Sequence, residues 1–460
     1  MNANKFEGGH MEKIEKDAHG PKEDSNTLFE ERGISRRSFI KSASVMAAAV
    51  ILPPLFKPSV AKAAAMSGSD TFVYVGCWQP QPSNWASPPT SEKGFGIFKY
   101  NAKTGDLELI TNLYDKVSVG QTCLDSKRNI LYCVDERMVH FESGERRSGS
   151  LIYAFAINPK TGDLTEINRR PSLGSLPSYV AVDAAGKYLI VTHHTNNTPI
   201  NKTVKDASGK YRSVFAYEDA ATVLFRLKND GSIGEACDAY MHTGSGPDPE
   251  QTHPRVHSVV MSPSGNLFAV CDKGGDKLFF FRINRKTEKL EVCGGKPYQS
   301  FPGSAPRYSV FHPTRPYFYM NHEIKPVISA FRYTEDGKLD LIHAVDVLPE
   351  GTKVVRTVMP SDIRIHPSGK YLYTLTRGLD MISVHAINEK TGEIERIQTV
   401  KLDGAGPRGC AVSPDGRFIL IAALNDQKVV VWAIGEDGKV SPTGKSVKQP
   451  NPGNVTFFPG

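Results

Sequence analysis

The chain has 460 residues, of which 39% are apolar, and it contains 40 glycines and 31 prolines. This is enough apolar material for one large core or several small ones, and the glycine and proline content is typical of a chain with many turns. The formal net charge of +7 is spread along the chain, and no basic run is interleaved with aromatic residues. This pattern argues against a nucleic acid partner.

The N-terminal region has the pattern of an export signal. The run SRRSFIK at 35–41 matches a twin-arginine signal, with two arginines ahead of a polar residue, two apolar residues and a lysine. The apolar stretch at 43–56 is rich in alanine, broken by prolines and too short to span a bilayer comfortably as a permanent helix. Ala61-Lys62-Ala63 offers a small-x-small cleavage site.

These features divide the chain into two parts. We expect residues 1–66 to be a disordered N-terminus plus a twin-arginine signal peptide, and residues 67–460 to form the folded domain. The twin-arginine export machinery is then a partner, and the protein lies in the periplasm or outside the cell. No stable membrane span is expected after cleavage.

From residue 71 onward one unit recurs with a period of roughly 45 residues. Each unit has four short apolar strands, with turns of the Ser-Pro-x-Gly type after the first strand and Asp-Gly or Thr-Gly before the fourth. Four short strands per period, with glycine in the turns, are typical of propeller blades. The units lie near 71–111, 117–170, 175–240, 255–298, 306–348, 361–401 and 407–446. The sequence therefore predicts an all-β, seven-bladed β-propeller with four-stranded antiparallel blades.

The two ends of the repeat region complement each other. The first unit begins with a run like a second strand, Thr71 to Val75, and residues 455–458 supply a spare strand after the seventh unit. We expect this C-terminal strand to complete the first blade and close the ring. The third unit is longer, because residues 195–221 interrupt it between its second and third strands. This insertion is either a lid over one mouth of the ring or an interaction loop.

The seven cysteines show no CxxC spacing, so neither a zinc motif nor a redox motif is indicated. Cys123 and Cys133 lie on neighbouring predicted strands and could form a disulfide in an oxidising compartment, although buried thiols are the simpler interpretation.

Four histidines are interpreted as structural. His193 and His194 have no nearby partners in the sequence, which favours a solvated turn or strand end. His312 and His366 take the serine position of Ser-Pro-x-Gly turns and are interpreted as turn residues.

The last four units resemble the seven-bladed lactonase family, whose best-known members are 6-phosphogluconolactonases of the cycloisomerase type. The fungal carboxy-muconate lactonising enzyme is a relative. The resembling runs lie at 252–283, 303–333, 361–387 and 404–434, and the match is weaker in the first three units. The resemblance implies a site built from residues at the start of each blade's first strand, where they line the central opening.

Five segments of this chain match the family's motifs. Pro254-Arg255-Val256-His257-Ser258 keeps one histidine of a Pro-His-x-His-Ser-like motif as His257, while Arg255 replaces the other. Ala305-Pro306-Arg307-Tyr308 keeps the arginine of Gly-Pro-Arg-His and loses its histidine. His322-Glu323 keeps the glutamate of an Asn-Glu pair, and the arginines of the sixth and seventh blades appear in Thr376-Arg377 and Pro407-Arg408. The resemblance implies that His257 and Glu323 are catalytic and that the substrate is bound by Arg255, Arg307, Arg377 and Arg408.

Hydrolysis of a lactone needs an activated water, a site that stabilises the tetrahedral oxyanion, and a proton for the leaving alkoxide. The imidazole of His257 titrates near neutrality and is the natural base. Glu323 either orients this imidazole or, if desolvated, acts as the base itself. The arginines offer paired N–H donors to a carboxylate, a sugar phosphate or the oxyanion. The scheme needs no cofactor and no metal, although distant blades could still assemble metal ligands.

Three functions are compatible with these residues. The first is a lactonase acting outside the cytoplasm, where an unphosphorylated sugar lactone is a more plausible substrate than 6-phosphogluconolactone. The second is a non-catalytic propeller in the periplasm that binds a ligand or protein with its central face or with the 195–221 insertion. The third is a cycloisomerase that forms the lactone ring.

Overall fold

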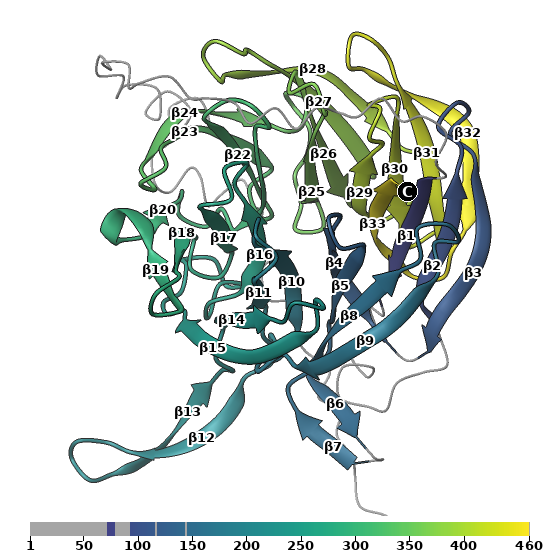
Figure 1. Ribbon diagram of the computed structural model, residues 1–460. Helices are drawn as coiled ribbons and strands as arrows, with labels where there is room; N and C mark the ends of the chain where they lie inside the picture. The colour runs from purple at the N-terminus through teal and green to yellow at the C-terminus, as the bar shows by residue number, and fades with distance from the viewer. Residues whose placement is uncertain (1–70, 79–92, 116, 143–144, 460) are drawn as a thin grey trace, which may run out of the picture. The chain divides into compact units, whose positions relative to one another are not determined.

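The computed structural model describes residues 71–78, 93–115, 117–142 and 145–459, and β-strands dominate these residues (Figure 1). Seven antiparallel sheets of four or five strands follow one another along the chain; six are meanders with their strands in chain order, and the first takes one strand from the C-terminal end. The all-β, seven-bladed prediction is confirmed. The predictions for residues 1–66 lie outside the described residues. In the described part, no helix is long and apolar enough to cross a membrane.

Within each blade the four strands lie side by side, with the first strand nearest the ring's centre and the fourth at its outer edge. The blades, each written from its innermost strand, are β33 (Pro452–Pro459), β1 (Thr71–Cys77), β2 (Lys93–Tyr100) and β3 (Leu107–Asp115); β4 (Val119–Asp125), β5 (Ile130–Asp135), β8 (Leu151–Ile157) and β9 (Leu164–Pro171); β10 (Pro177–Val182), β11 (Tyr188–His193), β14 (Ala221–Leu227) and β15 (Ile233–Met241); β16 (Val256–Met261), β17 (Phe268–Asp272), β18 (Lys277–Asn284) and β19 (Lys289–Val292), with β20 (Tyr298–Gln299) also on β18; β21 (Pro306–Phe311), β22 (Tyr317–His322), β23 (Val327–Tyr333) and β24 (Leu339–Asp346); β25 (Met359–Ile365), β26 (Tyr371–Arg377), β27 (Met381–Ile387) and β28 (Ile394–Lys401); and β29 (Pro407–Val412), β30 (Phe418–Ala423), β31 (Lys428–Ile434) and β32 (Val440–Lys448).

The ring is closed by β33, which pairs antiparallel with β1 and supplies the first blade's innermost strand. Val455 and Phe458 of β33 are buried in the clusters on either side of this blade. The Asn454 amide donates to the carbonyls of Val119 and Gly120 in the second blade, at 3.4 and 3.2 Å. The predicted closure is confirmed.

Neighbouring blades are joined by a recurring hydrogen bond. A tyrosine hydroxyl from the second strand of one blade donates to the carbonyl of the glycine in the turn between the third and fourth strands of the next. The four pairs are Tyr74 with Gly162, Tyr132 with Gly231, Tyr319 with Gly392 and Tyr373 with Gly438. The tyrosine ring fills the space between blades, and the bond satisfies a polar atom that packing would otherwise bury without a partner.

A register break interrupts the innermost strand of every blade near its start, where one extra residue is inserted relative to the second strand. In the fourth blade Val256 faces Asp272 and Ser258 faces Cys271, so His257 is the extra residue. Arg408 holds the same place in the seventh blade. A bulge of this kind changes the direction of a side chain, so the repeat provides seven such positions around the central opening.

The disulfide considered for Cys123 and Cys133 is wrong, since both thiols are free. Cys123 pairs in register with Tyr132, and Cys133 pairs with Thr122. Because successive residues of a strand point to opposite faces, the two thiols belong to different sides of the blade. They pack accordingly in two different hydrophobic clusters.

Two hairpins extend from the second-to-third strand connections of the second and third blades (Figure 1). One consists of β6 (Val139–Glu142) and β7 (Glu145–Ser148), and it was not predicted from the sequence. The other consists of β12 (Ile200–Lys205) and β13 (Tyr211–Ala216) and lies within the predicted 195–221 insertion. The position of that insertion between the second and third strands is confirmed.

Candidate active site

One face of the ring gathers the predicted site residues through two repeated backbone positions. The first is the bulge on the innermost strand, which supplies His257, Arg307 and Arg408. The second directly follows the second strand of blades two to five. Its backbone N–H donates to the carbonyl of the residue that directly precedes the innermost strand, in the pairs Glu136–Ser118, His194–Leu176, Lys273–Arg255 and Glu323–Ala305. Arg377 ends the second strand of blade six.

Glu323 is the centre of the site. Its carboxylate forms ion pairs with Lys273 Nζ at 3.0 Å, Arg307 Nε at 2.9 Å and Arg377 Nη2 at 3.2 Å. Burial alone would raise the pKa of the Glu323 carboxyl, but the three cations hold that pKa well below its usual range. A carboxylate of this kind is a poor proton acceptor, so the geometry favours Glu323 as the group that positions the cations.

Lys273 was not identified from the sequence, because it lies in an Asp-Lys-Gly-Gly run typical of a turn. It belongs to the site because Asp272 accepts the backbone N–H groups of Arg255 and Gly274, at 2.7 and 3.0 Å, which fixes the turn. Burial lowers the pKa of Lys273 to about 8, although Glu323 opposes this change. Its occurrence at the same repeat position as Glu323 is the sequence signal that could have found it.

The remaining arginines extend the positive surface. Arg255 is buried, its Nη1 lies 3.8 Å from Glu250, and its Nε has no hydrogen-bond partner in the part of the chain that the structure describes. Arg408 stacks on the Trp78 ring at 3.7 Å and lies 3.6 Å from Glu136. Burial lowers the pKa of both arginines, and it lowers that of Arg377 to about 10. Five cations therefore face two largely buried carboxylates, Glu136 and Glu323, so the site attracts an anion.

His257 is buried between two rings, with His194 at a centroid distance of 5.3 Å and Tyr308 at 5.0 Å. Its Nδ1 is buried and has no hydrogen-bond partner among the described residues. Burial and the nearby Arg307 charge lower the pKa of His257 well below its usual value, so the imidazole is neutral.

The interpretation of His193 and His194 as a solvated turn or strand end is right about the strand end, since β11 ends at His193, and wrong about solvation, because His194 is only partly exposed and its ring packs against that of His257. His193 is fully buried, with Nδ1 3.1 Å from the carbonyl of Ala221. His194 Nδ1 lies 3.0 Å from the Thr195 carbonyl oxygen. A carbonyl only accepts, so the proton is on Nδ1 and the Nε2 lone pair remains available. Burial, with the charge of Lys273, lowers the pKa of His194 well below its usual value.

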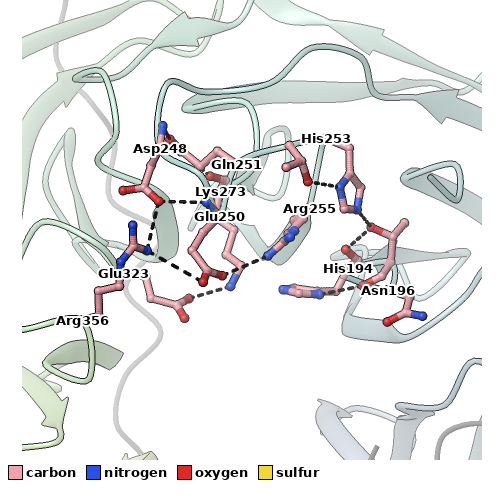
Figure 2. Close-up of polar contacts among 12 residues, drawn as sticks. His194, Asn196, Asp248, Glu250, Gln251, His253, Arg255, Lys273, Glu323 and Arg356 are labelled. Carbon is pink, nitrogen blue, oxygen red and sulfur yellow. Dashed lines mark hydrogen bonds and ion pairs between the residues drawn. The ribbon is translucent and has the colours of Figure 1, made fainter. Parts of the chain in front are cut away.

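The site's rim is tied together by polar contacts from three loops (Figure 2). Arg356 Nη1 lies 3.4 Å from Asp248 and 3.8 Å from Glu250, the residue that also faces Arg255. On the other side, His253 Nε2 lies 3.0 Å from the Thr195 hydroxyl. Thr195 has a φ of 66°, a strained value for a β-branched residue, so the rim holds His194 in a fixed conformation.

The structural turn histidines lie elsewhere. His312 Nδ1 accepts the backbone N–H of Thr314, and His366 Nδ1 accepts that of Ser368, both at 3.1 Å. Both histidines are therefore turn residues, as predicted. Within the described ranges, no group of three or more His, Cys, Asp or Glu side chains is placed to hold a metal ion.

Comparisons with known proteins agree with this fold. A family model described as "Lactonase, 7-bladed beta-propeller" matches residues 73–457, and the chain belongs to this family. The chain is 26% identical over 343 residues to a 6-phosphogluconolactonase of Formosa agariphila, a match that covers 74% of this chain and 88% of that protein. It is 25% identical over 309 residues to the 6-phosphogluconolactonase of Bacillus subtilis, covering 67% of this chain and 80% of that one.

Solved structures show the same architecture. The periplasmic gluconolactonase of Pseudomonas aeruginosa superposes with a TM-score of 0.72 at 22% identity, over 85% of this chain and 99% of that one. A putative 6-phosphogluconolactonase of Bacteroides fragilis gives a TM-score of 0.68 at 24% identity, over 85% and 98% of the two chains. At these identities the likeness establishes the fold.

Proposed function

We propose that this protein hydrolyses a sugar-type lactone that carries an anionic group, at the central face of the propeller. The observation that carries the proposal is the excess of cations around a pair of neutral imidazoles, in a chain of the lactonase family. The names of the relatives support a lactone as substrate. Because the site is positively charged, we expect the lactone to carry a carboxylate or a phosphate.

The chemistry follows from the charges. Arg307 and Lys273 polarise the lactone carbonyl and then stabilise the tetrahedral oxyanion formed by water attack. An imidazole takes the proton of that water and returns it to the ring oxygen when the carbon–oxygen bond breaks, which leaves an open-chain hydroxy acid. His257 is the base expected from the sequence, and His194 offers a second one, with its Nε2 lone pair already unprotonated. Because the acid ionises at neutral pH, each turnover releases one proton.

We further propose that the twin-arginine signal exports the protein to the periplasm or the cell exterior. Sugar phosphates are mainly cytoplasmic, so export favours a carboxylate-bearing lactone over 6-phosphogluconolactone as the natural substrate. No cofactor takes part in the scheme.

The alternative of a non-catalytic binding propeller also has an observation in its favour. The lowered pKa values of His194 and His257 make both imidazoles weak bases, while the cations would still hold a sugar acid. A cycloisomerase would use the same groups to form the lactone ring.

A panel of neutral, carboxylated and phosphorylated lactones with a pH indicator separates these functions. We expect acid release that is faster on anionic lactones and falls at least about 100-fold in His257→Ala or His194→Ala, the smaller end of the range for a lost general base. His366→Ala removes an imidazole from a turn outside the site and serves as the matched control. Calorimetric binding of a sugar acid with no acid release from any lactone would instead identify a binding protein.

A further inference from the structure

The hairpin β12–β13 is not explained by hydrolysis. Among the described strands its two strands pair only with each other, and nearly all of their residues are exposed. Because both faces are exposed, the hairpin has no hydrophobic core of its own, and an isolated two-stranded hairpin is only marginally stable in water. The hairpin nevertheless rises from the face of the ring that carries the site, since His194 directly precedes its root.

The root of the hairpin is fixed to the rim of the site. The Tyr217 ring stacks on the His253 ring at a centroid distance of 4.1 Å. The Glu218 carboxylate accepts the Ser175 hydroxyl and the Asn196 backbone N–H, both at 3.0 Å. The ribbon is therefore held in place at its base while its length extends into solvent (Figure 1).

The exposed surface of the ribbon is apolar on both faces. It carries four of the nine large hydrophobic side chains that are exposed in the described part of the chain: Ile200 (67%), Tyr211 (72%), Val214 (36%) and Phe215 (71%). Directly opposed residues of an antiparallel pair share a face. The register therefore puts Phe215 and Tyr211 on one face and Ile200 and Val214 on the other. Such a concentration of exposed apolar side chains marks an interaction surface.

The ribbon is also basic. Residues 200–216 contain Lys202, Lys205, Lys210 and Arg212 against the single Asp206, which gives a net charge of +3. This charge disfavours edge-to-edge pairing with the identical ribbon of a second copy, because lysines on an edge strand oppose such pairing. It favours an anionic partner by charge complementarity.

We propose that the β12–β13 hairpin docks the protein on an anionic lipid surface. Apolar side chains on both faces of a thin ribbon need an environment that surrounds it, which a lipid headgroup layer provides and a rigid polymer in contact with one face does not. Tyrosine and phenylalanine suit the boundary between headgroups and acyl chains, and the cations pair with lipid phosphates. The site then opens toward the membrane surface.

The test uses the full chain and sedimentation with vesicles of phosphatidylcholine, alone or with about a third phosphatidylglycerol. We expect binding that requires phosphatidylglycerol, and at least about a tenfold weaker partition for Lys202→Glu/Lys205→Glu, because each basic residue near an anionic surface contributes a factor of roughly five. Tyr211→Ser/Phe215→Ser should weaken partition similarly. None of these side chains belongs to the site, so lactone hydrolysis in solution should stay unchanged.

Matched controls are Leu109→Ser/Ile110→Ser, which removes exposed apolar side chains of β3, and Lys370→Glu/Lys401→Glu on the sixth blade. A direct readout of the ribbon is Phe215→Trp, whose fluorescence should be quenched by brominated phosphatidylglycerol beyond the quenching of the wild type. Equal partition of all variants, or no added quenching at position 215, would overturn the proposal. So would loss of a dimer, seen by light scattering, as the sole effect of Tyr211→Ser/Phe215→Ser.

Discussion

The three ion pairs of Glu323 allow a quantitative prediction for Glu323→Gln. At an effective dielectric constant of about 20, a pair at this separation is worth about 5 kcal/mol before desolvation and the mutual repulsion of the cations. Removal of one partner of a buried ionic group typically costs about 3–5 kcal/mol, which is a large share of the roughly 5–15 kcal/mol that holds a domain folded. We expect Glu323→Gln to lower the free energy of unfolding in urea by about 3–5 kcal/mol.

Glu136→Gln is the matched control. Glu136 lies 3.6 Å from one cation, Arg408, and burial raises the pKa of its carboxyl, so its charged form gains little from the site. We expect that variant to lower the free energy of unfolding by less than Glu323→Gln does, because the Glu136 carboxylate makes one ion pair and that of Glu323 makes three.

The pH dependence provides a second check on Glu323. Its folded pKa lies below the unfolded value, so its contribution is present above the unfolded pKa of about 4.3 and is lost as the pH falls through the folded pKa. The decrease in the free energy of unfolding as the pH falls below about 4.3 should therefore be smaller in Glu323→Gln than in the wild type. Added sulfate or a sugar acid should stabilise Glu323→Gln more than the wild type, because an anion replaces the missing counter-charge. A Glu323→Gln protein as stable as the wild type, or a loss equal to that of Glu136→Gln, would refute the role of Glu323 as the organiser of the cations.

Two further predictions concern charge and closure. Because the pKa of Lys273 is about 8, the calorimetric affinity of the wild type for a sugar acid should fall as the pH rises through 8. Lys273→Met should bind the sugar acid more weakly at pH 7, and its affinity should not fall as the pH rises through 8. A fall in affinity that persists in this variant would contradict the assignment of the pH dependence to Lys273. Truncation after Pro452 removes the buried apolar side chains of Val455 and Phe458, which contribute about 2 kcal/mol each, and the strand pairing with β1, in which each backbone hydrogen bond contributes about 1 kcal/mol. The truncated chain should therefore lose its cooperative melt by circular dichroism. Phe458→Leu should retain the melt, and a truncated protein that melts at the native temperature would contradict the closure.

The fold was predictable because each blade repeats local signals that agree with one another. Turns such as Ser262-Pro263-Ser264-Gly265 stop the innermost strand, and glycines such as Gly392 take the positive φ that the later turn requires. Even the closure by β33 follows from counting strands. The disulfide considered between Cys123 and Cys133 does not form, because two cysteines on adjacent strands can still point to opposite faces of the blade. The face of each side chain depends on the strand register, which pairs Cys123 with Tyr132.

The site was only partly predictable, since its burial is created by several blades at once. Glu323 was found through its family motif, whereas Lys273 and His194 occupy the equivalent repeat position without any local motif. His194 looks like a surface residue in sequence, yet the strained Thr195 and the neighbouring fourth blade enclose it. The positive character of the site depends on five cationic side chains from four blades, a sum that no single stretch of sequence contains.

The pairing of β33 with β1 also has a consequence for synthesis. The ribosome produces Thr71–Cys77 early, but the strand that covers its inner edge is not available until Pro459 has emerged. Throughout translation the nascent first blade therefore presents an unpaired strand edge, which is a template for misassembly with other chains. We expect chains stalled before residue 452 to be bound by chaperones or removed by proteases. The pairing of β33 with β1 thus separates chains that can complete the first blade from chains that cannot.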